Sequence, residues 1–209
     1  MGQAASVFKL AAILFIALFY ALFLGKSILL YWKDGINPFV LGKDKGKVNA
    51  TIERLFPAGL LYWTVEVFGV CLGLPALLWP KAAFSTTTDN TSLKVTGMIV
   101  LALGFALFLS ALISFGRSWR VGIYKKAPGE LVTRGVFQFT RNPIFVFIDL
   151  LFIGIWMVLG NFFFLLAASI AVAVMDYQIR QEEEYLSCLY GESYRVYKAK
   201  VNRYFGGRL

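Results

Sequence analysis

The chain has 209 residues, of which 58% are hydrophobic and 16% are charged, and its mean hydropathy is +0.67. This composition excludes an ordinary soluble domain and predicts an integral membrane protein. The sequence contains no histidine, which excludes Ser-His-Asp catalysis and histidine metal sites, and we expect no metal. The formal net charge of +9 fits cationic span ends that face anionic lipid, so we expect membrane lipid and not nucleic acid as a partner.

Five apolar windows are long enough to cross a hydrocarbon core, which takes roughly 20 helical residues. In chain order they are 7–25, 58–80, 94–115, 143–160 and 161–177. The last two windows meet directly, which predicts a helical hairpin. A signal peptide competes for the first window, but only Lys9 precedes the apolar run, so we expect a retained span. The expected fold class is therefore all-α, a polytopic membrane protein with five transmembrane helices plus a C-terminal cytoplasmic amphipathic helix.

Positive charge alternates between the segments that connect these windows. Of the 21 Lys and Arg residues, 18 lie in residues 26–57, 116–142 and 178–209. Because positive charge concentrates on the cytoplasmic side, we expect the N-terminus outside and the C-terminus in the cytoplasm, in a bacterial or archaeal inner membrane or in the endoplasmic reticulum. The chain would then divide into residues 1–115, with three spans and a polar cytoplasmic loop at 26–57, and residues 116–209, which carry the motifs described next.

Acidic residues within predicted spans are a further signal. Glu66 lies in the second window, Asp149 in the fourth and Asp176 at the end of the fifth. Acids in hydrocarbon are costly and mark functional sites, although interhelical hydrogen bonds explain them as well. For Glu66 and Asp149 both interpretations stay open, whereas Asp176 lies close enough to water to need no special role.

Beyond the last window the sequence continues a helical pattern that leaves the membrane. On a wheel of 100° per residue, Glu182 and Glu183 point with a stripe of leucine and tyrosine in residues 186–197, whereas Glu184 points away. Carboxylates pressed toward an apolar face need a cationic partner, for which Arg141 and a bound cation are both possible. The alternative is an acidic cluster on the helix surface that stays in water.

The stretch LVTRGVFQFTRNPIF, residues 131–145, places a polar corner directly before the fourth window. Asn142 is suited to cap a helix and Pro143 to occupy its first position, so the corner has an explanation as a helix start alone. It also leaves a helix N-terminus open with Arg141 beside it, which predicts a polar pocket at headgroup depth. The expected topology places this corner on the same side of the membrane as Glu182 and Glu183.

Residues 116–205 resemble the isoprenylcysteine carboxyl methyltransferase and phospholipid methyltransferase superfamily, integral membrane enzymes that use S-adenosylmethionine. The resemblance rests on Gly116 and Trp119, on LVTRGVFQFTRNPIF, and on EEEYLSCLYGESYRVY followed by VNR. Either long motif alone is a weak signal. Both motifs, in this order and separated by one hairpin, are a fairly specific one.

The chain departs from the family pattern at four positions. Asn142 stands where the family usually has histidine, so an imidazole is not required at this position. Phe145 replaces a tyrosine, Phe147 fills a position that is often small, and Asn202 replaces a proline. The changes at Phe145 and Phe147 bear on how the methyl acceptor fits more than on cofactor binding.

The resemblance implies a methyltransferase that uses S-adenosylmethionine and acts on a lipophilic or amphiphilic acceptor, such as an isoprenylcysteine carboxylate or a lipid. Catalytic roles would fall to Arg141, which would orient a carboxylate of the substrate or of Glu183, and to Glu183 itself. The acceptor would enter sideways from the lipid, and the cofactor from the cytoplasm. The implied cofactor-binding residues are Leu131, Val132, Gly135, Asn142, Pro143, Phe145, Glu182 and Glu183.

Two other functions compete with this interpretation. A membrane reductase of the sterol reductase type resembles the same architecture but uses NADPH, and Arg195, Lys198 and Tyr194 are compatible with it. A non-catalytic lipid-binding protein that retained the fold is compatible with the replacements at Asn142 and Phe145. Binding of S-adenosylmethionine or of NADPH separates the three.

Overall fold

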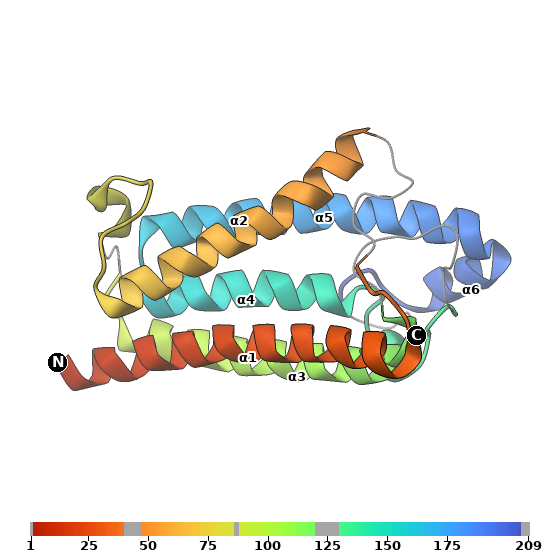
Figure 1. Cartoon of the computed structure of the whole chain (residues 1–209), viewed down its shortest axis with the longest axis horizontal. Helices are drawn as coiled ribbons and strands as arrows, with labels where there is room; N and C mark the ends of the chain where they lie inside the picture. Colours follow the sequence, from red (N-terminus) through yellow and green to blue (C-terminus); the bar gives the residue numbers. More distant parts are fainter. Residues whose placement is uncertain (1, 40–46, 86–87, 120–129, 206–209) are drawn as a thin grey trace.

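The structure, a computed structural model, describes residues 2–39, 47–85, 88–119 and 130–205. Within these ranges the protein is all-helical. The helices are α1 (Gly2–Asp34), α2 (Lys47–Leu72), α3 (Thr91–Phe115), α4 (Pro143–Leu159), α5 (Phe162–Tyr190) and α6 (Glu192–Lys200). Short 3₁₀ turns lie at Lys81–Phe84, Gly116–Ser118 and Gly135–Gln138. Figure 1 shows α1, α3, α4 and α5 running roughly parallel to the long axis, with α2 oblique to them.

Four helical stretches in the described part of the chain are long and apolar enough to cross a membrane. They are Ser6–Asp34, Leu55–Leu72, Thr91–Ser118 and Phe162–Tyr190. Helix α4 is equally apolar in character but has only 17 residues. The prediction of a membrane protein is therefore confirmed, whereas the number of spans rests on how α4 is accommodated.

The helices and the apolar windows that predicted them differ at their ends. Helix α2 ends at Leu72, so the prediction of a span up to residue 80 is wrong, whereas other helix ends lie beyond their windows. Helix α1 continues to Asp34, and α2 begins at Lys47, so both enter the segment expected as a polar loop; residues 40–46 of that segment lie outside the described residues. Helix α5 runs without a break to Tyr190. Hydropathy predicts which residues of a helix can lie in lipid, but it does not predict where the helix ends, because its backbone hydrogen bonds can continue into water.

Helices α3 and α4 pack closely because glycines face the contact. A Cβ added to Gly97 would lie 2.8 Å from the Cβ of Met157, and one added to Gly154 would lie 2.7 Å from Leu101 Cγ. Small residues let helix backbones approach each other, and this supplies packing contacts where lipid removes the hydrophobic driving force. Farther along the pair, the rings of Phe108 and Phe147 stack with centroids 4.3 Å apart.

Helices α4 and α5 are joined by a two-residue turn and lie side by side (Figure 1). Gly160 adopts φ 66° and ends α4, a left-handed conformation that glycine adopts without steric cost. The side chain of Asn161 then caps α5 by accepting a hydrogen bond from Phe164 N at 3.1 Å. The carbonyl oxygen of Gly160 also accepts a hydrogen bond from Thr88 N at 3.2 Å, which ties the turn to the segment before α3.

The acids in the spans have different environments. Glu66 is buried, and its Oε1 accepts a hydrogen bond from Leu77 N at 3.0 Å, so it holds the segment that follows α2. Asp149 is buried on α4, and its Oδ1 has no hydrogen-bond partner within the described ranges. Asp176 is bound by Arg180 Nε at 2.7 Å and by the Tyr204 hydroxyl at 2.8 Å.

Candidate functional site

The polar corner before α4 lies at one end of the helix bundle. Pro143 is the first residue of α4 and Asn142 is its N-cap residue, as the sequence predicts. The Asn142 side chain, however, does not bond to the helix amides, so the predicted capping role is wrong. Instead, Asn142 Nδ2 donates to Glu183 Oε1 at 3.3 Å and to the carbonyl oxygen of Arg203 at 3.1 Å. The amide therefore connects two distant segments of the chain.

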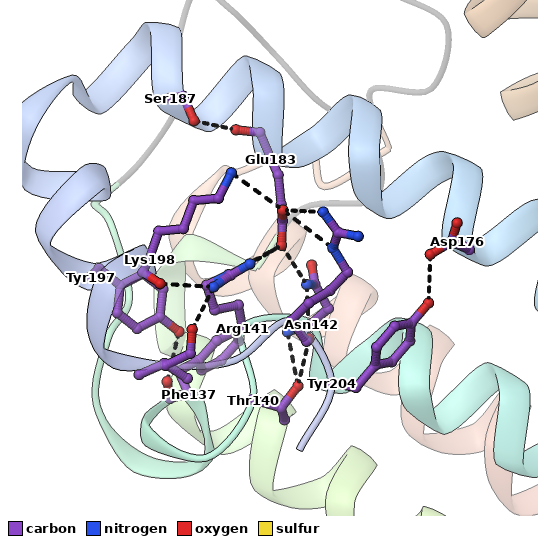
Figure 2. Close-up of polar contacts among 12 residues, drawn as sticks. Phe137, Thr140, Arg141, Asn142, Asp176, Glu183, Ser187, Tyr197, Lys198 and Tyr204 are labelled. Carbon is purple, nitrogen blue, oxygen red and sulfur yellow. Dashed lines mark hydrogen bonds and ion pairs between the residues drawn. The ribbon is translucent and has the colours of Figure 1, made fainter. Parts of the chain in front are cut away.

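Glu183 is the centre of this network (Figure 2). Its side chain is only 2% exposed. Arg141 donates to Oε1 twice, from Nε at 3.1 Å and from Nη2 at 2.7 Å. Arg203 donates to Oε2 from Nε at 3.3 Å and from Nη2 at 3.0 Å, and Lys198 Nζ lies 3.8 Å from the same oxygen. One buried carboxylate thus holds three cations, of which sequence reasoning had considered only Arg141 as a partner.

The C-terminal segment, residues 201–205, completes the site from a distance in sequence. The backbone N–H of Arg141 donates to the carbonyl oxygen of Asn202 at 3.1 Å. Arg141 Nη1 donates to the carbonyl oxygens of Val201 and, at 3.1 Å, of Lys198. Thr140 Oγ1 donates to the carbonyl oxygen of Arg203 at 3.1 Å. The Arg141 guanidinium is therefore held entirely by protein acceptors, and it fixes the C-terminal segment against the corner.

Arg203 is the principal residue of the network that sequence reasoning missed. The hydrogen bonds to Glu183 raise its pKa above the ordinary arginine value, so this side chain is cationic at every accessible pH. The sequence signal for this residue is the VNR ending, which is part of the family resemblance. No periodicity or spacing indicates that residue 203 returns to residue 183, because a glycine turn and a separate helix lie between them.

Helix α5 ends at Tyr190, and the residue that follows it, Gly191, has φ 53°. The helical wheel drawn continuously through residues 182–197 is therefore wrong beyond Tyr190. Tyr194 and Tyr197 are buried on α6, and burial raises the pKa of both phenols. The Tyr197 hydroxyl donates to the carbonyl oxygen of Phe137 at 2.6 Å. Within α5 the wheel is correct, since Glu184 is exposed while Glu183 is buried.

A cavity of about 510 Å³ adjoins the network. Its walls include aromatic side chains of α1, α2 and α3 as well as tyrosines of α5 and α6. Among the residues predicted from the sequence, those that line this cavity are Leu131, Val132, Arg141, Asn142, Pro143, Phe145 and Glu182. Glu183 and Gly135 are not among its lining residues in the described part of the chain. The two neighbouring acids therefore have different positions. Glu182 lines the cavity, whereas Glu183 lies behind its wall and is bonded to the lining residues Arg141 and Asn142.

Gly135 contributes through its backbone. It has φ 63° at the start of the 3₁₀ turn Gly135–Gln138, and a Cβ here would collide with Ser114 Oγ of α3. A glycine is therefore required for this turn to pack on α3. That packing places Phe137 against Phe115, with ring centroids 4.7 Å apart.

Two buried polar atoms at the cavity lack partners. Gln178 Nε2 and the Tyr194 hydroxyl have no hydrogen-bond partner in the ranges that the structure describes, and both residues line the cavity. Buried polar groups are nearly always paired. Water or the polar groups of a ligand would satisfy these two atoms, so they are available to a ligand in this space.

The fold and this site define an all-helical membrane protein in which a buried arginine, asparagine and glutamate network supports the wall of a largely aromatic cavity. Residues 93–193 match the family model described as phospholipid methyltransferase. A stretch of 104 residues is 34% identical to Protein-S-isoprenylcysteine O-methyltransferase of Schizosaccharomyces pombe, and the match covers 48% of this chain and 44% of that relative. The family match includes the first long motif and most of the second, and both matches support the resemblance of the chain to the isoprenylcysteine carboxyl methyltransferase and phospholipid methyltransferase superfamily.

Proposed function

We propose that the protein is a membrane methyltransferase that transfers a methyl group from S-adenosylmethionine to a lipophilic or amphiphilic acceptor. The observation that carries this proposal is the single cavity shared by the polar corner, Glu182 and the aromatic side chains of the first three helices. Such a cavity can hold a polar cofactor and an apolar acceptor in contact. The family match, which includes both Arg141 and Glu182, supports the same class of reaction.

The residues at the cavity fit S-adenosylmethionine. A cavity of about 510 Å³ lies within the range of roughly 300–1,000 Å³ common for small-molecule sites. Glu182 places a carboxylate where a sulfonium cation would be attracted. Gln178 and Tyr194 offer the unpartnered polar atoms that ribose or adenine would satisfy. Leu131, Val132 and Phe145 would form apolar walls around the base.

When bound, the cofactor supplies an electrophilic methyl group, and in-line displacement needs alignment and exclusion of water more than proton transfer. The aromatic walls would exclude water from the reacting atoms. Arg141 and Glu183 would act as positioning residues, because their donors and acceptors are satisfied by each other and by the backbone. Asn142 and Pro143 would keep the corner in place beside the cofactor. No step requires an imidazole.

Ligand titration tests this proposal. We expect the purified full-length chain in detergent to bind S-adenosylmethionine and its demethylated product saturably, and not NADPH. Binding of NADPH alone would support a reductase, and binding of neither would support a non-catalytic lipid-binding protein. Transfer of a labelled methyl group into a lipid extract would then identify the chemical class of the acceptor.

We further propose five spans with the C-terminus in the cytoplasm, on the basis of the alternating positive charge. Helix α4 would cross by packing against α3 and α5, with the membrane thinned or the helix ends in the headgroup layer. Cys188 is a free, exposed thiol on the polar part of α5, so it reports the side on which that part lies. A membrane-impermeant maleimide should label it in inside-out vesicles and not in right-side-out vesicles; the reverse pattern would invert the topology.

A further inference from the structure

A second cavity, of about 350 Å³, lies beside α6 and the C-terminal segment. It shares Arg141 with the aromatic cavity and is otherwise lined by different residues. The residues that line it are Arg141, Arg195, Lys198, Ala199, Asn202 and Arg203. Four of these are cationic, and none of those in the described part of the chain is acidic. We refer to it as the basic cavity.

The basic cavity carries more positive charge than its neighbouring acids neutralise. Arg141, Arg203 and Lys198 all lie within 4.0 Å of the single carboxylate of Glu183. Arg195 pairs with Glu192 at 2.8 Å. Asp176 also attracts Arg203 but is itself paired with Arg180, so five cations beside three carboxylates leave a formal excess of two positive charges. Cations held this close repel one another, so a bound anion would lower the electrostatic energy of the folded protein.

Several donors of the basic cavity are available to a ligand. Arg203 uses Nε and Nη2 for Glu183, and Nη1 has no partner in the ranges that the structure describes. Lys198 Nζ, at 3.8 Å from Glu183 Oε2, is too far for a hydrogen bond. The side chains of Lys198 and Arg203 are 47% and 28% exposed. Both can therefore bind a ligand from solvent while Glu183 keeps its bonds to Arg141.

We propose that the basic cavity binds a phosphate group. Guanidinium groups match the oxygens of a phosphate in a forked geometry, and an ammonium group adds a mobile point charge. The cavity lies at the end of the bundle where α4 begins and α5 becomes polar, a position that the phosphate of a lipid headgroup or a free phosphate can reach. A bound phosphate would hold α6 and the C-terminal segment against the polar corner through Arg203. This inference is independent of methyl transfer.

Thermal unfolding of the full-length chain in a phosphate-free maltoside detergent tests the proposal. In one arm inorganic phosphate replaces chloride at constant ionic strength; in the other, phosphatidic acid is added to the micelles. We expect the unfolding midpoint to rise in at least one arm. A rise with both ligands indicates a general phosphate site, and a rise with phosphatidic acid alone assigns the site to a lipid headgroup.

The basic cavity is tested with three charge-neutralising variants. Lys198→Gln and Arg195→Gln should each weaken the apparent affinity about fivefold, the effect of removing one charge near 4 Å in a wet site. Lys200→Gln is the matched control, because Lys200 is exposed on the same helix and does not line the cavity. The unliganded midpoint of each variant reports whether it folds. No rise in either arm, that is, equal responses to phosphate and chloride together with no response to phosphatidic acid, would overturn the proposal. So would equal affinities in all three variants.

Discussion

Replacement of Glu183 by glutamine tests whether one carboxylate holds the candidate site together. The change is isosteric and removes a single negative charge. In the wild type this carboxylate accepts hydrogen bonds from Arg141, Asn142 and Arg203. A glutamine retains one acceptor oxygen and places an amide N–H₂ opposite one of the arginines, where two donors would face each other.

The expected loss of stability follows from which cation is left without a counter-charge. Arg203 and Lys198 are partly exposed and can turn toward water, so their share of the loss is small. Arg141 is only 7% exposed, and breaking a buried ion pair by removal of one partner costs about 3–5 kcal/mol. The remaining oxygen of glutamine offsets part of this cost, which leaves about 3 kcal/mol. For a chain of this size that corresponds to a decrease in the unfolding midpoint of roughly 6–12 °C.

The measurement is thermal unfolding in detergent, with Glu184→Gln as the matched control. Glu184 is the next residue on α5 and is exposed, so its replacement should change the free energy of unfolding by less than about 0.5 kcal/mol. Similar midpoints for Glu183→Gln and Glu184→Gln would refute the role assigned to Glu183. So would a Glu183→Gln variant of normal stability that fails to bind cofactor, because the carboxylate would then act on the ligand directly.

Three other perturbations separate cofactor binding from structure. Glu182→Gln should weaken binding of S-adenosylmethionine about fivefold in a calorimetric titration, near 1 kcal/mol for a lost charge interaction, and should lower the unfolding midpoint less than Glu183→Gln does. Unchanged binding with a midpoint as low as that of Glu183→Gln would make Glu182 structural. Gly160→Ala should destabilise the fold by about 2 kcal/mol, because its Cβ meets Thr88 O at φ 66°, whereas Gly59→Ala, with nothing within 4 Å, should not. Burial raises the pKa of the Tyr197 phenol above its ordinary value, so the folded state binds this proton more tightly than the unfolded state does. The resulting stabilisation is complete below about pH 10 and is lost at higher pH. Tyr197→Phe should therefore flatten the alkaline decrease in the unfolding midpoint, and an unchanged decrease would assign it to other groups.

The sequence predicts the helices and the position of the corner because both depend on local properties. Apolar windows specify where a helix can lie in lipid, and Asn142 with Pro143 specifies where α4 begins. The convergence of Arg141 with Glu183 was a hypothesis from topology, and these residues are in direct contact. A buried carboxylate beside a tyrosine stripe requires a cation. This requirement identified Arg141 as a candidate partner of Glu183 although the two residues are 42 positions apart in the sequence.

Other features depend on long-range geometry that a linear pattern does not carry. Gly191 ends α5 with a positive φ, although glycine also occurs inside helices at a cost of only about 1 kcal/mol. The turn there sends α6 back toward the corner, and this places Arg203 on the second oxygen of Glu183. Likewise, the family resemblance implies that Gly135 lies beside the cofactor, whereas in the structure Gly135 packs closely against Ser114 of α3. Glycine marks a backbone requirement without indicating which neighbour imposes it.

Asn142 shows how the network functions without histidine. Its single amide nitrogen donates to both Glu183 and the backbone of Arg203, whereas a neutral imidazole has only one N–H. A protonated imidazole would donate twice, but it would add a fourth cation to the three that already surround Glu183. The amide makes both bonds without charge, and it does not titrate near pH 6.5 as histidine does. The link between the corner, the buried carboxylate and the C-terminal segment is therefore independent of pH around neutrality, at a position where the positive charge is already in excess.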